Sequence, residues 1–295
     1  MGEIRVRTSR LGMTRNPPLA RRNAVSVLLL SLLVWQSPHA FGDFPRADEF
    51  AQRVRKALQL DYQIQKDFSY LERRRDIRIS RLGKVTIGPL RTFEVYPSEQ
   101  PGRTYKRLIE IEGKPLTPDE LKRRDAEHLR DLQQEAERAR TETAQQRAER
   151  LEKAEAERRQ RDAILDDAVA VFAPTFVARE IIDGARILAA DVKPRTAAHV
   201  TTREGRWMKH FDGRIWVDES DYQVVKLEMR AFEDVTIGWG IVGRLYKGSR
   251  LHFSRRRFDG AWVPSEVTYQ ASGRTLLFRP FQFAVTTTYS NYKRR

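Results

Sequence analysis

Apolar positions near the start of the chain, in residues 47–64, recur every three or four residues. They are Phe50, Val54, Ala57 and Leu58. This spacing puts them on one face of a helix whose other face is basic. From residue 69 the period shortens to two, so residues 69–116 predict three strands joined by turns in an antiparallel meander. We expect the strands at about 69–79, 84–96 and 103–112.

Residues 118–165 consist mostly of Glu, Arg, Lys, Gln and Ala. Thr117 followed by Glu120 is a capping box, with Pro118 in the first turn, so a helix is expected to begin here. An apolar seam at Leu129 and Leu132 thins to small residues further along. Two interpretations remain open: a solvated helix held by ion pairs between successive turns, or a coiled-coil-like arm that binds a partner helix. The helix continues through the apolar stretch 163–172.

From residue 176 to the end the alternation of a β structure dominates, with glycine-centred turns at hairpin spacing. In residues 224–231 the alternation places Val225, Leu227 and Met229 on one face of a strand. The three acids just before it, Asp218, Glu219 and Asp221, predict a solvent-facing turn. The fold class expected is α+β: a strongly curved antiparallel sheet, or half-open barrel, with a helical lid and a long charged helical insertion.

The first 42 residues predict an export signal. Six arginines precede the apolar run 24–35, which is followed by small residues, with cleavage expected after Ala40 or Gly42. The run is short for a membrane span. The chain has no cysteine, hence no disulfide and no cysteine to carry a lipid anchor. We expect a periplasmic protein released by a cleaved signal peptide.

The net charge is +15, and +5 of it belongs to residues 1–42, since six arginines there face one glutamate. The remaining +10 favours anionic partners such as a phospholipid surface or a nucleic acid. Export argues against nucleic acid, so an anionic membrane surface is the partner that the charge leaves open.

Candidate chemistry is sparse. The histidines are scattered singly, serines lack a nucleophile setting, and the glycine-rich stretch 236–249 lacks the lysine and hydroxyl residue that end a phosphate-binding loop. We therefore expect that the protein is not an enzyme and that it has no catalytic residue, no metal and no cofactor. The sheet instead carries many apolar and aromatic residues with few helices to cover them. They could line an apolar hollow for acyl chains or fill an ordinary core.

Several segments, in this order, resemble a known family. They are FEVYPSE, EGKPLTPDE, DGRIWVDESDYQVVKLE, EDVTIGWG and LYKGSRLHFSRRRFDGAWVPSEV. Together with the first helix they resemble the outer-membrane lipoprotein-sorting proteins of the LolA/LolB type, as a divergent branch with a long charged insert. The resemblance implies a half-open barrel that shields lipid chains. It places the apolar cavity at Leu227, Met229, Leu251, Phe253, Val263 and Val267, to which the alternation adds Val225.

The sequence pattern divides the chain into four parts, and the resemblance implies that the last three form one domain with an insert. The four parts are a signal at 1–42, a helix and first meander at 43–117, the charged insert at 118–165, and the remaining sheet with the end of the lid helix at 166–295. The function expected is a non-enzymatic carrier of lipid or lipoprotein acyl chains in lipoprotein sorting. The alternative is a periplasmic interaction or scaffold protein with a filled β core, whose charged helix 118–165 recruits a protein partner.

Overall fold

A computed structural model describes residues 43–97, 104–237, 243–276 and 278–295. Residues Gly42–Arg295 form one compact unit. The predicted export signal at 1–42 lies outside the described residues.

The strands of this unit form one large antiparallel sheet. In the described residues its order is β4-β3-β2-β1-β13-β12-β11-β8-β7-β6-β5, with β9 and β10 attached beside β12. The bounds are β1 Phe68–Ile79, β2 Val85–Tyr96, β3 Tyr105–Ile111, β4 Lys114–Pro115, β5 Phe172–Ile182, β6 Ala185–Pro194, β7 Phe211–Asp218, β8 Val224–Ala231, β9 Val235–Ile237, β10 Gly243–Leu245, β11 Arg250–Phe258, β12 Ala261–Thr275 and β13 Arg279–Arg294.

The predicted meander is present as β1, β2 and β3, within one or two residues of the expected bounds. It joins the rest of the sheet through β1, which pairs with β13 from Phe68 opposite Arg294 to Arg73 opposite Thr288. The first strand of the described chain therefore lies beside the last. The sheet is not closed, because β4 and β5 stand at its two ends.

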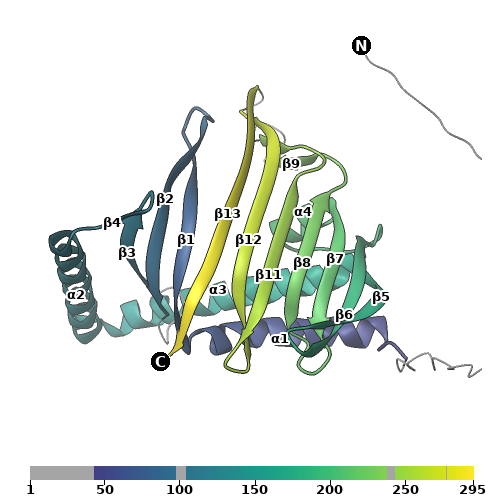
Figure 1. Cartoon of the computed structure of the whole chain (residues 1–295), viewed down its shortest axis with the longest axis horizontal. Helices are drawn as coiled ribbons and strands as arrows, with labels where there is room; N and C mark the ends of the chain where they lie inside the picture. Colours follow the sequence, from purple (N-terminus) through teal and green to yellow (C-terminus); the bar gives the residue numbers. More distant parts are fainter. Residues whose placement is uncertain (1–42, 98–103, 238–242, 277) are drawn as a thin grey trace, which may run out of the picture. The chain divides into compact units, whose positions relative to one another are not determined.

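Four helices complete the described unit: α1 Ala47–Gln65, α2 Pro118–Thr141, α3 Ala144–Val171 and α4 Arg203–Met208. Helix α1 matches the predicted amphipathic helix, and Figure 1 shows α1 and α3 running across the strands. The predicted capping box opens α2, where the Thr117 side chain accepts from the Glu120 N–H and the Glu120 carboxylate accepts from the Thr117 N–H.

The charged block is two helices rather than the single helix expected. The chain leaves helical geometry at Glu142, and Thr143 then caps α3 in a second capping box with Gln146. Because a capping box satisfies the free N–H groups of a new helix start, it stabilises a break at this point. In Figure 1, α2 stands across the line of α3.

Apolar side chains pack on both faces of the sheet. Under α1, a cluster joins Phe50 and Val54 of the helix to Leu188, Val217 and Val224 of the strands. The residues next to these in each strand point to the opposite face. There they form a second cluster of Ala185, Ile187, Ala189, Trp216, Val225 and Trp262. Strands β6, β7 and β8 therefore supply two cores at once.

Candidate functional site

An apolar cavity of about 570 Å³ lies between the helices and the sheet. Its walls come from α1, the last two turns of α3, the short helix α4, and the inner face of the strands from β5 to β11. All lining residues except Arg55 and Glu204 are apolar. They are Phe50, Ala51, Val54, Leu58, Ile164, Leu165, Ala168, Val169, Phe172, Pro174, Val192, Trp207, Met208, Phe211, Ile215, Val224, Leu227, Met229, Leu251 and Phe253.

Two polar contacts fix α1 against α3 at the rim of the cavity. The Arg55 Nε donates to Asp166 Oδ1 at 2.5 Å, and the Gln59 amide donates to Asp162 Oδ1 at 2.8 Å. The hydrogen bond to Asp166 raises the pKa of Arg55. The two helices thus form one cover over the apolar wall.

Helix α4 is held by a buried carboxylate. Asp167 of α3 is 3% exposed and accepts from the backbone N–H of Thr201 at 3.0 Å and of Thr202 at 2.7 Å. Burial raises the pKa of Asp167, but these hydrogen bonds and those of the two threonine hydroxyls outweigh burial and hold the pKa below its ordinary value. A Cβ on Gly205 would lie 2.3 Å from Asp167 Oδ2, so only glycine allows α4 to pack this closely.

The structure brings four of the seven predicted cavity residues together. Leu227 and Met229 of β8 and Leu251 and Phe253 of β11 all line the cavity. They face each other across the two strands, with Leu227 opposite Phe253 and Met229 opposite Leu251. Whether these side chains bind a ligand stays a prediction.

The other three predicted residues lie outside the cavity wall. Val267 is the strand partner of Phe253 on β12, one strand beyond the lining. Val263 packs with Phe68 and Tyr292 in a separate cluster. Val225 packs against Trp262 and Trp216 on the opposite face of the sheet.

The expectation that Val225 points the same way as Leu227 and Met229 is wrong, because β8 contains a bulge. Trp216 pairs with Lys226 and Val217 pairs with Val224, so Val225 is an extra residue in the ladder. A bulge shifts the alternation by one position. It turns Val224 toward the cavity and Val225 away from it.

Helices α3 and α4 form much of the cavity wall, and the sequence predicted this for α3 alone. The apolar stretch 163–172 predicts a cover, and it supplies Ile164, Leu165, Ala168 and Val169. Helix α4, with Trp207 and Met208, was missed inside a β pattern. Its one sequence signal is Thr202, whose hydroxyl caps the helix by accepting from the Gly205 N–H.

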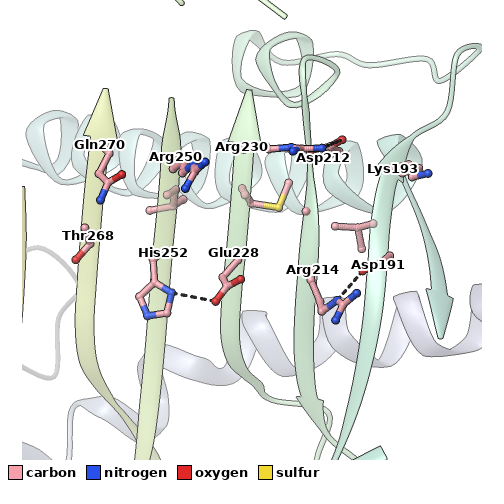
Figure 2. A pocket seen from close by; sticks show the side chains of 14 residues that line it. Asp191, Lys193, Asp212, Arg214, Glu228, Arg230, Arg250, His252, Thr268 and Gln270 are labelled. Carbon is pink, nitrogen blue, oxygen red and sulfur yellow. Dashed lines mark hydrogen bonds and ion pairs between the residues drawn. The ribbon is translucent and has the colours of Figure 1, made fainter. Parts of the chain in front are cut away.

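A second hollow, of about 630 Å³, lies on the other face of the sheet, and most of the residues that line it are charged or polar. Figure 2 shows Asp191, Arg214, Glu228 and His252 in a row across four strands, with helices behind the sheet. Arg214 Nε lies 2.6 Å from Asp191 Oδ1, and His252 Nδ1 lies 3.6 Å from Glu228 Oε1. The contact with Arg214 lowers the pKa of Asp191. Opposite charges on neighbouring strands stabilise a sheet face, and this explains the row without a ligand.

Asp218 is the last residue of β7, and Glu219 and Asp221 lie in the predicted turn between β7 and β8. The expectation that the whole turn faces solvent is wrong for Asp218, which is 1% exposed. Its Oδ2 accepts from the indole N–H of Trp262 at 2.8 Å. The Glu219 carboxylate accepts from Arg179 and Arg186. These acids hold the strands together at this end.

Two negative findings concern the part of the chain that the structure describes. Among the described residues, no group of three or more His, Cys, Asp or Glu side chains is placed to hold a metal ion. In the same part of the chain, the helices are all too short or too polar to cross a membrane.

Comparison with known proteins finds distant similarity of fold. No protein-family model and no curated protein matches the chain. The structure is similar to a DUF1329 family protein from Desulfovibrio piger, with 10% identity, a TM-score of 0.27, and 85% of this chain and 94% of that chain covered. It is also similar to an outer membrane lipoprotein-sorting protein domain from Vibrio parahaemolyticus, described as putative, with 9% identity, a TM-score of 0.29, and 83% and 93% covered.

Proposed function

We propose that the chain is an exported, non-enzymatic carrier that holds an acyl chain of a lipid or lipoprotein in the apolar cavity. The observation that carries the proposal is the composition of the wall, which is apolar except for Arg55 and Glu204. Its volume of about 570 Å³ falls in the ordinary range of ligand sites. In this proposal the open sheet acts as a half-barrel, α1, α3 and α4 are its lid, and residues 1–42 direct the chain to the periplasm.

The binding energy needed is modest. Each CH₂ group buried contributes about 0.8 kcal/mol, so a stretch of roughly ten carbons gives about 8 kcal/mol before ordering costs are subtracted. This gross magnitude sets micromolar affinity as about the tightest that such a stretch can reach, and the ordering costs make binding weaker. A carrier that must both take up and release its cargo works in this range without covalent chemistry.

Filling the cavity tests the proposal. Ala168→Trp places an indole in the wall, whereas Ala156→Trp makes the same change on the exposed part of α3. Binding of a fluorescent fatty acid should weaken by about tenfold or more in Ala168→Trp, since the ring occupies the space of several CH₂ groups. Ala156→Trp should bind like the parent chain.

Native mass spectrometry of the protein purified from its own periplasm gives a second reading. Co-purified lipid is expected on the parent chain and on Ala156→Trp, and much less on Ala168→Trp. Equal probe binding by the two variants, or a parent chain that neither carries lipid nor binds the probe, would overturn the carrier proposal.

A second candidate function, recruitment of a protein partner, is favoured by the exposed face of α2. Helix α2 is anchored to β3 near its start, where Arg107 Nε donates to Asp125 Oδ1 at 2.7 Å. Further along, Leu129 is 58% and Leu132 47% exposed. Pull-downs with Leu129→Ser/Leu132→Ser should lose any partner that the parent chain captures. Capture unchanged by this variant would sink the recruitment proposal.

A further inference from the structure

One end of the sheet carries large apolar side chains in water. Ile79 and Leu82, at the turn between β1 and β2, are 63% and 68% exposed, and Phe278, between β12 and β13, is 75% exposed. Figure 1 shows these two turns at the same end of the strands. Exposed clusters of this kind on a protein surface mark interaction sites.

The two turns are in direct contact and make one surface. The Thr275 hydroxyl donates to the Gly83 carbonyl, and a Cβ on Gly83 would lie 3.1 Å from the Leu276 side chain. Within the first turn, the Gly83 N–H donates to the Ser80 carbonyl at 2.8 Å. The backbone of Gly83 has a φ of 73°. This conformation favours glycine, so the turn has a defined shape before any partner arrives.

The stretches of chain that carry these apolar side chains also carry cations and contain no acid. Residues 77–88 and 274–283 contain no Asp or Glu. Exposed side chains of Arg78, Arg81, Lys84 and Arg279 lie in these stretches. In the described residues, none of the four has an ion pair or side-chain hydrogen bond. The nearest acid in the sequence, Asp76, is already engaged by Arg74 and Arg91.

We propose that this surface, formed by Ile79, Leu82 and Phe278 with Arg78, Arg81, Lys84 and Arg279, docks on an anionic phospholipid bilayer. Apolar side chains at a rigid turn enter the boundary between head groups and acyl chains, while the cations around them contact lipid phosphates. Cations that have no acid beside them in the sequence attract an anionic surface more strongly than a neutral one. None of these seven residues lines the apolar cavity, so docking on a bilayer does not depend on the binding of an acyl chain.

Vesicle sedimentation tests the inference. Since Gly42–Arg295 is a compact unit, the test uses this part, without the apolar stretch 24–35. Vesicles of phosphatidylglycerol and phosphatidylethanolamine should bind it about tenfold or more tightly than vesicles of phosphatidylcholine alone, and added salt should weaken binding.

Two sets of variants separate the apolar and the charged contributions. Ile79→Ser/Leu82→Ser/Phe278→Ser and Arg78→Glu/Arg81→Glu/Lys84→Glu should each lower affinity for the anionic vesicles by about tenfold or more. Controls make the same kinds of change elsewhere on the surface: Leu129→Ser/Leu132→Ser replaces two exposed apolar residues on α2, and Arg147→Glu/Lys153→Glu/Arg158→Glu reverses three charges on α3. The controls should stay within about twofold of the parent chain.

Binding that is equal for the variants and their controls would overturn the inference. So would a change in sedimentation of the vesicle-free protein with vesicle binding unchanged, because the surface would then be a contact between two copies. Binding of a fluorescent fatty acid should be the same in all these variants. Loss of vesicle binding with the fatty acid still bound supports docking, and a parent chain that docks but never binds the fatty acid refutes only the carrier proposal.

Discussion

Replacing Asp218 with alanine should destabilise the protein far more than the same change at Asp221, three residues further along the chain. Asp218 accepts from the Trp262 indole N–H at 2.8 Å, from the Ser220 N–H at 2.8 Å and from the Ser220 hydroxyl at 2.6 Å. Trp262 is 1% exposed. Its N–H therefore has no access to water as a replacement acceptor.

The magnitude follows from these contacts. A buried donor left without a partner costs about 1–3 kcal/mol, whereas water can replace the lost acceptor for the exposed Ser220 groups at about 0.5 kcal/mol each. Asp218→Ala should therefore lower the free energy of unfolding by about 2–4 kcal/mol. Asp218→Asn keeps one acceptor oxygen and should lose roughly half as much.

The same carboxylate predicts a pH dependence. Burial raises the pKa of Asp218, but the hydrogen bonds from Ser220 and Trp262 and the charge of Arg257 outweigh burial, so its pKa in the folded protein lies below the ordinary value. The stability it contributes is therefore present above the unfolded pKa of about 3.9 and is lost as the pH falls through the folded pKa. In Asp218→Asn this part of the acid sensitivity should disappear.

Urea titration followed by tryptophan fluorescence, at pH 7 and at intervals down to pH 3, measures both effects. Asp221 is exposed and accepts from the Gln223 N–H at 2.9 Å, so Asp221→Ala should cost no more than about 1 kcal/mol. Equal losses for the two alanine variants, or an unchanged acid profile in Asp218→Asn, would refute the view that the buried carboxylate stabilises the fold by joining β7 to β12.

Three further substitutions probe the packing by urea titration. Arg255→Met should lower the free energy of unfolding by about 3 kcal/mol, because Asp61, whose Oδ2 lies 2.7 Å from Arg255, loses its charge partner. Adding Asp61→Leu should restore most of this loss. A double variant no more stable than the single one would contradict the role of the ion pair. Gly213→Ala should lower the free energy of unfolding by about 2 kcal/mol or more, since its Cβ would lie 1.9 Å from the Glu228 carbonyl oxygen. A loss under about 0.5 kcal/mol would show that β7 and β8 move apart at little cost. Asp167→Ala should cost about 2 kcal/mol and speed proteolysis at α4, and unchanged cleavage there would show that α4 is held by other contacts.

Local pattern predicted the elements that repeat over many residues. Helix α1 and strands β1 to β3 follow the expected bounds closely, because each combines a clear period with turn or cap residues at its ends. The break at Glu142 and Thr143 was readable in principle, since Thr143 and Gln146 have the spacing of a capping box. The long run of helix formers on both sides concealed it.

Features that depend on distant contacts could not be predicted in this way. Helix α4 is six residues long and is held by Asp167, a residue 36 positions before its first residue Arg203. The bulge at Val225 leaves no mark in the sequence, because the apolar and polar residues of β8 alternate there as they would in a regular strand. Four of the cavity residues were found because β8 and β11 alternate regularly beyond the bulge, and Val225 was misplaced because it is the bulge.

In the described residues, the main path of the open sheet ends at two edge strands, where a further strand could add. A strand edge with free N–H and C=O groups is a template for pairing with another chain, which leads to aggregation. At one edge β4 has only two residues, one of which, Pro115, has no N–H to donate. The other edge, β5, has Pro174 and a register shift between Phe176 and Ala178. The two end strands of this open sheet thus hinder its growth into a larger sheet.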